Sequence, residues 1–231
     1  MIEAAGVTKF FGTRPALRGV TFQLEEGRFL GVFGHNGAGK TTLLKLLSTL
    51  ARPSSGAIRV GGYDLTEDAI EVRSQIGLVS HQTLLYDDLT AEENLSFFGK
   101  MYDVPGLDAR IREVLSSVGL LHRRHDRVRT FSRGMQQRLA IARAILHAPP
   151  LLLLDEPDTG LDQQAGSILE DLLIDTGARG RTVVMTTHNL ERGFQMCNRL
   201  MFLVNGTIAY EEDKGNLTFG DFKQIYSRFT Q

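Results

Sequence analysis

The chain has 231 residues, of which 42% are hydrophobic and 23% are charged, and its net charge is −1 at neutral pH. This composition is typical of a soluble globular protein, and the length is sufficient for one large α/β domain or two small lobes. The balanced charge, without a basic tail or stripe, argues against nucleic acid as a partner. The single cysteine, Cys197, excludes an internal disulfide framework and a multi-cysteine metal site, which fits a reducing compartment.

No apolar stretch approaches the roughly 20 residues that a membrane-spanning helix needs. One of the longest, from Leu139 to Leu146, is interrupted by Arg143. The N-terminus carries Glu3 and lacks the basic and then apolar pattern of a signal peptide. We therefore expect a chain that is soluble by itself, so that any membrane spans it works with belong to other chains.

The first third of the chain predicts strands separated by turns. Residues 1–29 are rich in strand signals, and apolar and polar residues alternate from Val20 to Leu24 before the turn at 25–27. A loop and helix are expected within Asn36–Ala51, after a short apolar strand. Further strands are predicted at Ala57–Val60 and Ile76–Ser80.

From Thr83 to about Leu146 the pattern changes to helical periodicity with few strand signals. Helices are predicted at Leu89–Tyr102, Asp108–Val118 and Ser132–His147. Such a block of helices between strand-rich segments predicts a helical lobe inserted in an α/β core.

The last third returns to alternating strands and helices. The predicted strands are Leu151–Asp155 and Arg181–Thr186, with a hairpin across Asn205-Gly206 that joins Arg199–Val204 to Thr207–Tyr210. The predicted helices are Gln163–Thr176, one that starts within Asn189–Gln195, and an amphipathic segment at Leu217–Phe229.

The stretch from Gly34 to Thr42 fits the P-loop pattern G-x-x-x-x-G-K-[ST] between an apolar strand and a helix. Its glycines let successive backbone N–H groups point at phosphate oxygens, and the start of the helix adds the positive end of its dipole. Lys40 is expected to reach the β- and γ-phosphates, and the Thr41 hydroxyl to bind Mg²⁺. The sequence therefore predicts binding of a nucleoside triphosphate with Mg²⁺.

Two acids follow the apolar run from Leu151 to Leu154, which is typical of a strand buried on both faces. Asp155 lies at the tip of this strand, where a carboxylate can hold Mg²⁺. Glu156, next to it, can polarise an attacking water as a general base.

A third element begins at Ser132, a good N-cap, and continues through Gly134 into a predicted helix. A helix N-terminus is an anion site by geometry, although an ordinary capped helix explains this pattern equally well in isolation. Its place, one helix before the acid-tipped strand, favours the anion site.

With these motifs in order, the chain resembles the ATP-binding cassette (ABC) family over nearly its whole length. The resemblance rests on the P-loop at 34–42, Gln82 after a strand, the signature at 132–134, Asp155-Glu156, and His188 after a strand. Residues 158–162 resemble the loop that follows the catalytic acid.

The resemblance implies one ABC nucleotide-binding domain over residues 1–231. Its fold would be a P-loop α/β core at 1–82 and 148–231, with an antiparallel β subdomain and a helical subdomain inserted at about 83–147. It also implies the following roles: Lys40, Glu156, His188 and Gln82 in catalysis; Phe11, Gly34, Asn36, Gly37, Gly39, Lys40, Thr41, Thr42, Ser132 and Gly134 in ATP binding; and Thr41, Gln82 and Asp155 at Mg²⁺.

Family membership also implies partners and location. Ser132 and Gly134 would bind the γ-phosphate held by a second copy, so that ATP joins two chains head to tail. Gln82 would sense an integral membrane permease, which places the chain at the cytoplasmic face of a membrane as a peripheral subunit. Phe11 would stack on adenine, although Phe10 could replace it and Phe11 could belong to the core.

Four positions depart from the family's common pattern. Arg133 and Met135 replace Gly and Gln in the signature, His35 replaces Pro in the P-loop, and Asp158 replaces an apolar or small residue. Because Ser132 and Gly134 are kept, we expect activity to be retained.

A narrower resemblance covers Val79–Leu95 and Thr130–Leu139. These stretches look like the ATP-binding subunit of the haem exporter used in bacterial cytochrome c maturation, which implies a haem-export role. The alternative is a soluble ABC ATPase in an assembly process such as iron–sulfur cluster assembly. A DNA-repair cassette is disfavoured because the interval between Lys40 and Ser132 has no room for a coiled-coil or zinc insertion.

Overall fold

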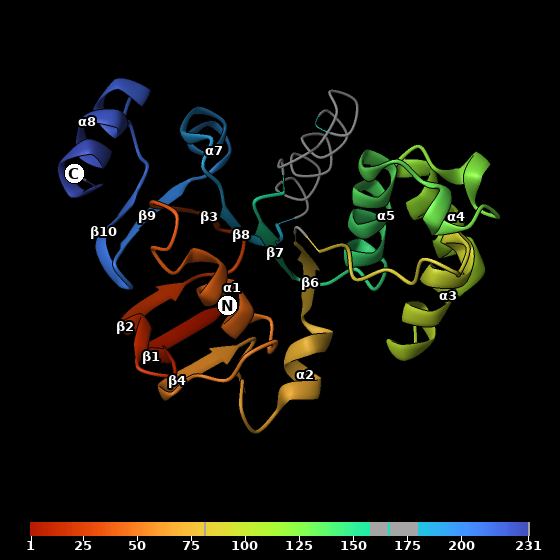
Figure 1. Ribbon diagram of the computed structural model, residues 1–231, viewed down its shortest axis with the longest axis horizontal. Helices are drawn as coiled ribbons and strands as arrows, with labels where there is room; N and C mark the ends of the chain where they lie inside the picture. Colours follow the sequence, from red (N-terminus) through yellow and green to blue (C-terminus); the bar gives the residue numbers. More distant parts are fainter. Residues whose placement is uncertain (81, 158–165, 167–179, 231) are drawn as a thin grey trace.

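The computed structural model describes residues 1–80, 82–157, 166 and 180–230, and these form two sheets with helices packed against them (Figure 1). The larger sheet has strand order β10-β9-β3-β8-β7-β6, and the smaller has order β2-β1-β4-β5. The larger sheet is parallel except for the antiparallel pair β9 and β10, and the smaller is antiparallel throughout.

The strands are β1 Ile2–Phe11, β2 Arg14–Leu24, β3 Phe29–Phe33, β4 Ser55–Val60, β5 Tyr63–Asp64, β6 Ile76–Val79, β7 Leu151–Asp155, β8 Thr182–Thr186, β9 Arg199–Val204 and β10 Thr207–Asp213. The helices are α1 Lys40–Leu47, α2 Ala69–Ser74, α3 Ala91–Met101, α4 Leu107–Ser117, α5 Arg133–Ile145, α7 Leu190–Met196 and α8 Phe219–Thr230, with 3₁₀ turns at Leu121–Arg123 and Val128–Thr130. Of these, α2 and β5 have no counterpart in the sequence prediction, and the helix predicted at 163–176 falls where only Gly166 is described. Among the described residues, no helix combines the length and the apolar character needed to cross a bilayer.

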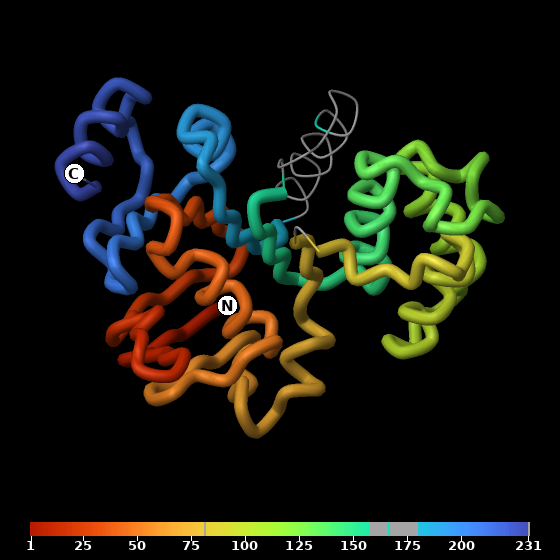
Figure 2. The backbone as a smooth tube through the Cα atoms, in the orientation of Figure 1, coloured from red at the N-terminus to blue at the C-terminus, as the bar shows by residue number. Residues whose placement is uncertain are grey.

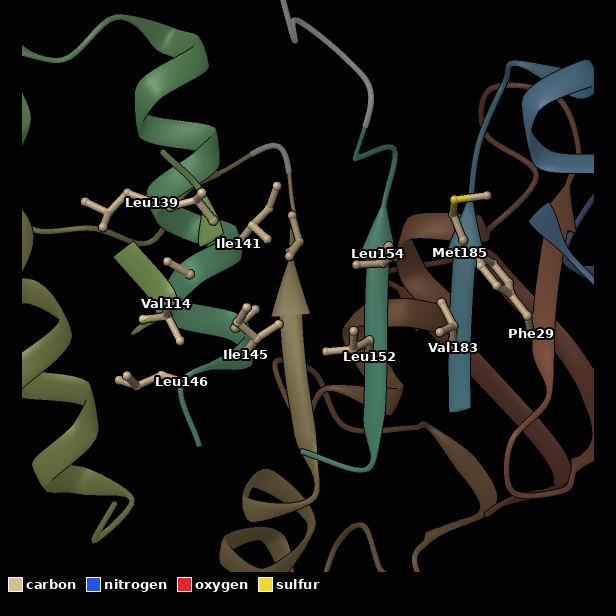
Figure 3. Packing of buried hydrophobic residues seen from close by; sticks show 14 of the residues in the cluster. Phe29, Val114, Leu139, Ile141, Ile145, Leu146, Leu152, Leu154, Val183 and Met185 are labelled. Atoms are coloured by element: carbon tan, nitrogen blue, oxygen red, sulfur yellow. The ribbon is translucent and has the colours of Figure 1, made fainter. Parts of the chain in front are cut away.

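The parallel strand β7 separates two hydrophobic cores. Leu151 and Leu153 face a core that also contains α1 and the smaller sheet, whereas Leu152 and Leu154 face the core shared with α4 and α5 (Figure 3). All five residues of β7 are buried, as an apolar run without alternation predicts. The sheet therefore has the P-loop helix on one face and the helical segment on the other.

The chain leaves the larger sheet after β6, forms α3, α4 and α5, and returns to it through β7 (Figure 2). The start of α3 is fixed locally by a capping box, in which the Thr90 hydroxyl accepts from the Glu93 amide and the Glu93 carboxylate accepts from the Thr90 amide. The end of α5 is fixed by a tertiary contact, because Arg110 on α4 donates to the carbonyl oxygens of Ile145 and Leu146.

Arg143 joins this helical segment to the sheet. Its guanidinium, on the buried side of α5, donates to the carbonyl oxygens of Leu78 at 2.8 Å and Leu84 at 3.3 Å, and it lies 5.2 Å from the ring centroid of Phe98. Burial lowers the pKa of this arginine to about 10. One side chain thus holds both ends of the segment that contains Gln82.

Replacing Arg143 with methionine is expected to lower the free energy of unfolding by about 2–4 kcal/mol, because two carbonyl groups lose their donor. Urea denaturation of the purified chain measures this change. Arg112→Met, at an exposed position on α4, is the matched control and should change stability by less than about 0.5 kcal/mol. Equal stability of the two variants would contradict the structural role of Arg143.

Candidate functional site

The P-loop turns sharply between β3 and α1, and two glycines make this turn possible. Gly34 has φ 155°, and a Cβ atom there would lie 2.2 Å from the carbonyl oxygen of Leu203. Gly39 has φ 108°, and its Cβ atom would lie 2.7 Å from the carbonyl oxygen of Ala16. Any side chain at either position would push the loop away from the strands beneath it.

Lys40 begins α1 and turns its side chain back over the loop. Its ammonium donates to the carbonyl oxygens of Gly34 at 2.7 Å and His35 at 3.2 Å. Burial lowers the pKa of Lys40, while the nearby carboxylates of Glu156 and Asp155 oppose this shift. The loop therefore surrounds a positive charge at the N-terminus of a helix, an arrangement that suits an anion.

Asp155, at the end of β7, receives hydroxyl groups from two other elements. Thr41 on α1 donates to its Oδ1 atom at 3.1 Å, and Thr186 at the end of β8 donates to the same atom at 2.7 Å. Hydroxyl and carboxylate oxygens are the ligands that Mg²⁺ prefers, so Thr41 and Asp155 fit this ion by chemistry.

Glu156 follows in a left-handed backbone conformation, with φ 48°. This conformation is sparsely populated for residues other than glycine, and here the Glu156 amide is held by the carbonyl and hydroxyl oxygens of Thr186, at 3.0 and 3.1 Å. The Glu156 carboxylate lies 3.6 Å from Nδ1 of His188. The Glu156 carboxylate, which lines the P-loop pocket, and the imidazole of His188, which follows β8, thus lie close together beside the P-loop.

An open pocket of about 400 Å³ lies over the P-loop. It is lined by Phe11, Ala16, His35, Asn36, Gly37, Gly39, Lys40, Thr41, Thr42 and Glu156. Phe11 is exposed at the edge of this pocket, with the ammonium of Lys9 lying 5.2 Å from its ring centroid. Phe11, rather than Phe10, lines the pocket.

Gln82 borders a second, smaller space. This space, of about 30 Å³, also touches Asp155, Ser80 and the α1 side chain of Lys45. The Ser80 hydroxyl donates to the carbonyl oxygen of Gln82 at 2.7 Å. Gln82 and Asp155 therefore share one water-sized cavity behind the P-loop helix.

Ser132 and Gly134 are not brought to this pocket. They lie at the start of α5, and the Ser132 hydroxyl caps that helix by accepting from the Met135 amide at 3.3 Å. The residues that line the P-loop pocket include neither of them. Ser132 and Arg133 are exposed, so this helix start faces outward from a single chain.

Comparison with known proteins identifies the family. The family described as ABC transporter matches residues 17–159. The chain belongs to the ABC transporter family. The linearmycin resistance ATP-binding protein LnrL of Bacillus subtilis is 38% identical over 208 residues, covering 89% of this chain and 67% of that protein. A fluoroquinolones export ATP-binding protein of Mycobacterium tuberculosis is 38% identical over 211 residues, covering 90% of this chain and 69% of that protein.

Solved structures confirm the ABC-type α/β fold. A structure described as the ATP-binding subunit of an ABC transporter has a TM-score of 0.91 and 28% identity, with full coverage of both chains. The dimeric ATP-binding cassette MJ0796, in a post-hydrolysis state bound to ADP and Pi, has a TM-score of 0.84 and 30% identity over 94% of this chain and 100% of that chain. As a member of this family with this fold, the chain is an ATPase.

Three residues of this ABC site were not predicted as site residues: Thr186, Ala16, and His35, which lines the pocket as part of the P-loop. Thr186 is fully buried and bonds both to the Asp155 carboxylate and to the Glu156 amide, and the signal for it is a hydroxyl at the end of the strand that precedes His188. Ala16 lines the pocket through its position on β2, which no sequence pattern indicates. The predicted loop at 158–162 lies outside the described residues.

Replacing Glu156 with glutamine is expected to leave ATP binding intact and to lower turnover by about 100-fold or more, because the amide cannot accept a proton from water. Phosphate release measures turnover, and size-exclusion chromatography with ATP measures the ATP-bound dimer that should accumulate. Glu67→Gln, at an exposed position outside the pocket, is the control. Wild-type turnover in Glu156→Gln would contradict the role of Glu156.

Proposed function

We propose that the chain is the ATP-hydrolysing subunit of a membrane exporter, acting with separate integral membrane permease subunits. It would work as a peripheral subunit at the cytoplasmic face of the membrane. The relatives described above support export, since they are named for fluoroquinolone export and linearmycin resistance. The observation that carries the ATP-hydrolysing part of the proposal is that the P-loop and Glu156 line the same pocket.

The predicted site residues in and around the pocket each have a chemical task in this proposal. Lys40 and the P-loop amides hold the phosphates, and Phe11 stacks on the adenine at the pocket edge. Thr41 and Asp155 would hold Mg²⁺, with Gln82 beside them; when bound, this ion offsets the charge of the phosphates. Glu156 accepts the proton of the attacking water, and His188 faces the γ-phosphate.

A second copy of a nucleotide-binding subunit completes the site in this proposal. Ser132 and Gly134 lie outside the pocket of their own chain at the start of α5, where Ser132 and Arg133 are exposed and Gly134 is buried behind them. Such a helix start can bind the γ-phosphate held by a facing chain, so that ATP is enclosed between two chains joined head to tail. The dimeric state of MJ0796 with ADP and Pi supports this arrangement. Residues 1–231 would act as one domain, in which the helical subdomain at about 83–147 carries the signature.

A groove next to Gln82, lined by apolar and basic side chains, suits the permease. It has a volume of about 300 Å³, lies between the end of α1, β6, α3 and α5, and is lined in part by Leu50, Leu84 and Phe98. Leu50 is 58% exposed and Leu84 is 43% exposed. Exposed apolar side chains around a groove are typical of a protein interface, here one that continues to the Gln82 segment.

The exported compound is less well defined by the sequence and the relatives than the ATPase role is. Haem export stays a prediction from the resemblance at residues 79–95 and 130–139, whereas the reported relatives are named for drug resistance and drug export. Cargo recognition belongs to the permease in either case, so the ATPase site described above serves both.

Replacing Ser132 with arginine is expected to reduce ATPase activity to background, because the new side chain occupies the place of the facing chain's γ-phosphate. Nucleotide binding by the isolated chain should stay within about twofold of wild type. Steady-state phosphate release and equilibrium binding of a fluorescent ATP analogue measure the two effects. Ser117→Arg, on α4, is the control, and weaker nucleotide binding by the Ser132→Arg monomer would argue against a shared site.

Association with a membrane permease is tested by purifying the tagged chain from detergent-solubilised membranes of its native host. Integral membrane proteins should co-purify with the wild-type chain, and Leu84→Asp in the groove should reduce their recovery at least about fivefold, because a charge is placed in an apolar contact. Leu50→Asp should act in the same direction. A haem-handling protein among the partners would favour haem export, and soluble partners alone would favour the iron–sulfur assembly alternative.

A further inference from the structure

The C-terminal helix of the described residues, α8, packs on β9, which pairs with β3, the strand that leads into the P-loop (Figure 1). Phe222 of α8 is fully buried, and its ring centroid lies 5.0 Å from that of Phe33. Phe33 is the last residue of β3 and directly precedes Gly34. The aromatic contact therefore supports the P-loop at the point where the chain leaves the sheet.

A second contact joins the other end of α8 to the loop itself. The imidazole of His35 donates from Nε2 to the carbonyl oxygen of Thr230, and its ring centroid lies 6.3 Å from that of Tyr226. The Thr230 hydroxyl donates to the carbonyl oxygen of Tyr226 at 2.7 Å, which fixes the last turn of the helix. A charged or polar donor suits this position, because the carbonyl groups at a helix C-terminus lack partners within the helix.

His35 is therefore held at both its side chain and its backbone. The His35 carbonyl oxygen accepts from the Lys40 ammonium at 3.2 Å and from the Ala38 amide at 3.1 Å. The conformation of this one residue thus links the end of α8 to the lysine that is expected to meet the phosphates.

We propose that α8 positions the P-loop through His35, and that His35 is a positioning residue for ATP binding. We call the contact set of His35, Tyr226 and Thr230 the α8 clasp. It reduces the conformational freedom of the loop before ATP arrives, and this preorganisation raises the affinity for nucleotide. The proposal depends on the ATP site alone, so it holds whatever the exported compound is.

Replacing His35 with alanine should weaken ATP binding by about three- to tenfold, the effect of one hydrogen bond. The turnover number at saturating ATP should change by less than about twofold, since Glu156 is untouched. His35→Gln should keep near-wild-type affinity, because its side-chain amide can still donate to Thr230. Equilibrium binding of a fluorescent ATP analogue and steady-state phosphate release measure the two quantities on the full chain.

A truncation separates the clasp from a direct contact between His35 and the nucleotide. Ending the chain after Ile225 removes Tyr226 and Thr230 but keeps Phe222, and it should weaken ATP binding as much as His35→Ala does. Combining the two changes should weaken binding no further, because they remove the same interaction. Additive losses would overturn the proposal in favour of direct contact with ATP.

The remaining outcomes are read from the point variants alone, so the test does not depend on the truncated chain folding. A melting temperature lowered by His35→Ala with unchanged ATP affinity would show a packing role only and would overturn the proposal. Equal losses in His35→Ala and His35→Gln would do the same. Gln224→Ala, at an exposed position of α8, is the control and should change neither quantity.

Discussion

One carboxylate oxygen joins the three elements on which the ATP site depends. Oδ1 of Asp155 accepts hydroxyl groups from Thr41 on α1 and from Thr186 on β8. The parallel pairing of β7 with β8 brings Asp155 beside Thr186, and the β3–α1 turn brings Thr41 to the same edge. Ligand sites of open α/β sheets form at this carboxyl edge because the strand ends gather there. This shared acceptor adds a polar link between the P-loop helix and the acid-tipped strand, which also pack together through the core that contains Leu151 and Leu153.

The same strand also divides the protein into two working faces. Leu151 and Leu153 pack toward α1 and the smaller sheet, whereas Leu152 and Leu154 pack toward α4 and α5. Since neighbouring residues of a strand point to opposite faces, a five-residue strand connects a nucleotide-binding core with a helical one. Both cores pack against this strand and so fix the position of Asp155 and Glu156 at its end. The P-loop helix α1 and the signature helix α5 thus pack on opposite faces of one sheet, and the ATPase acids lie at the edge between them.

The parts of the site that the sequence predicted are those whose chemistry is local in the chain. The P-loop and Asp155-Glu156 are contiguous motifs with fixed local geometry, so Lys40, Thr41 and Glu156 could be named and do line one pocket. Thr186 and Ala16 reach the site through strand pairing, and of the two only Thr186 has a local signal, its hydroxyl at the end of a strand. The choice between Phe10 and Phe11 depends on which side of β1 faces the pocket. The short elements β5 and α2 carry too few apolar positions to form a pattern, since Val72 is the only buried residue of α2.

The bridge made by Arg143 constrains the number of residues between Leu78 and Leu84. Its guanidinium donates to the backbone carbonyls of Leu78 and Leu84. The bridge therefore depends on the length of the segment between these residues and not directly on the side chains in it. Substitutions between these two positions leave this bridge intact, whereas inserting or deleting one residue would move one carbonyl out of reach. Exchange of this segment between related cassettes should therefore be tolerated only when the number of residues is preserved. In this segment, next to the groove proposed for the permease, adaptation to a new partner has to proceed by replacing residues at constant length.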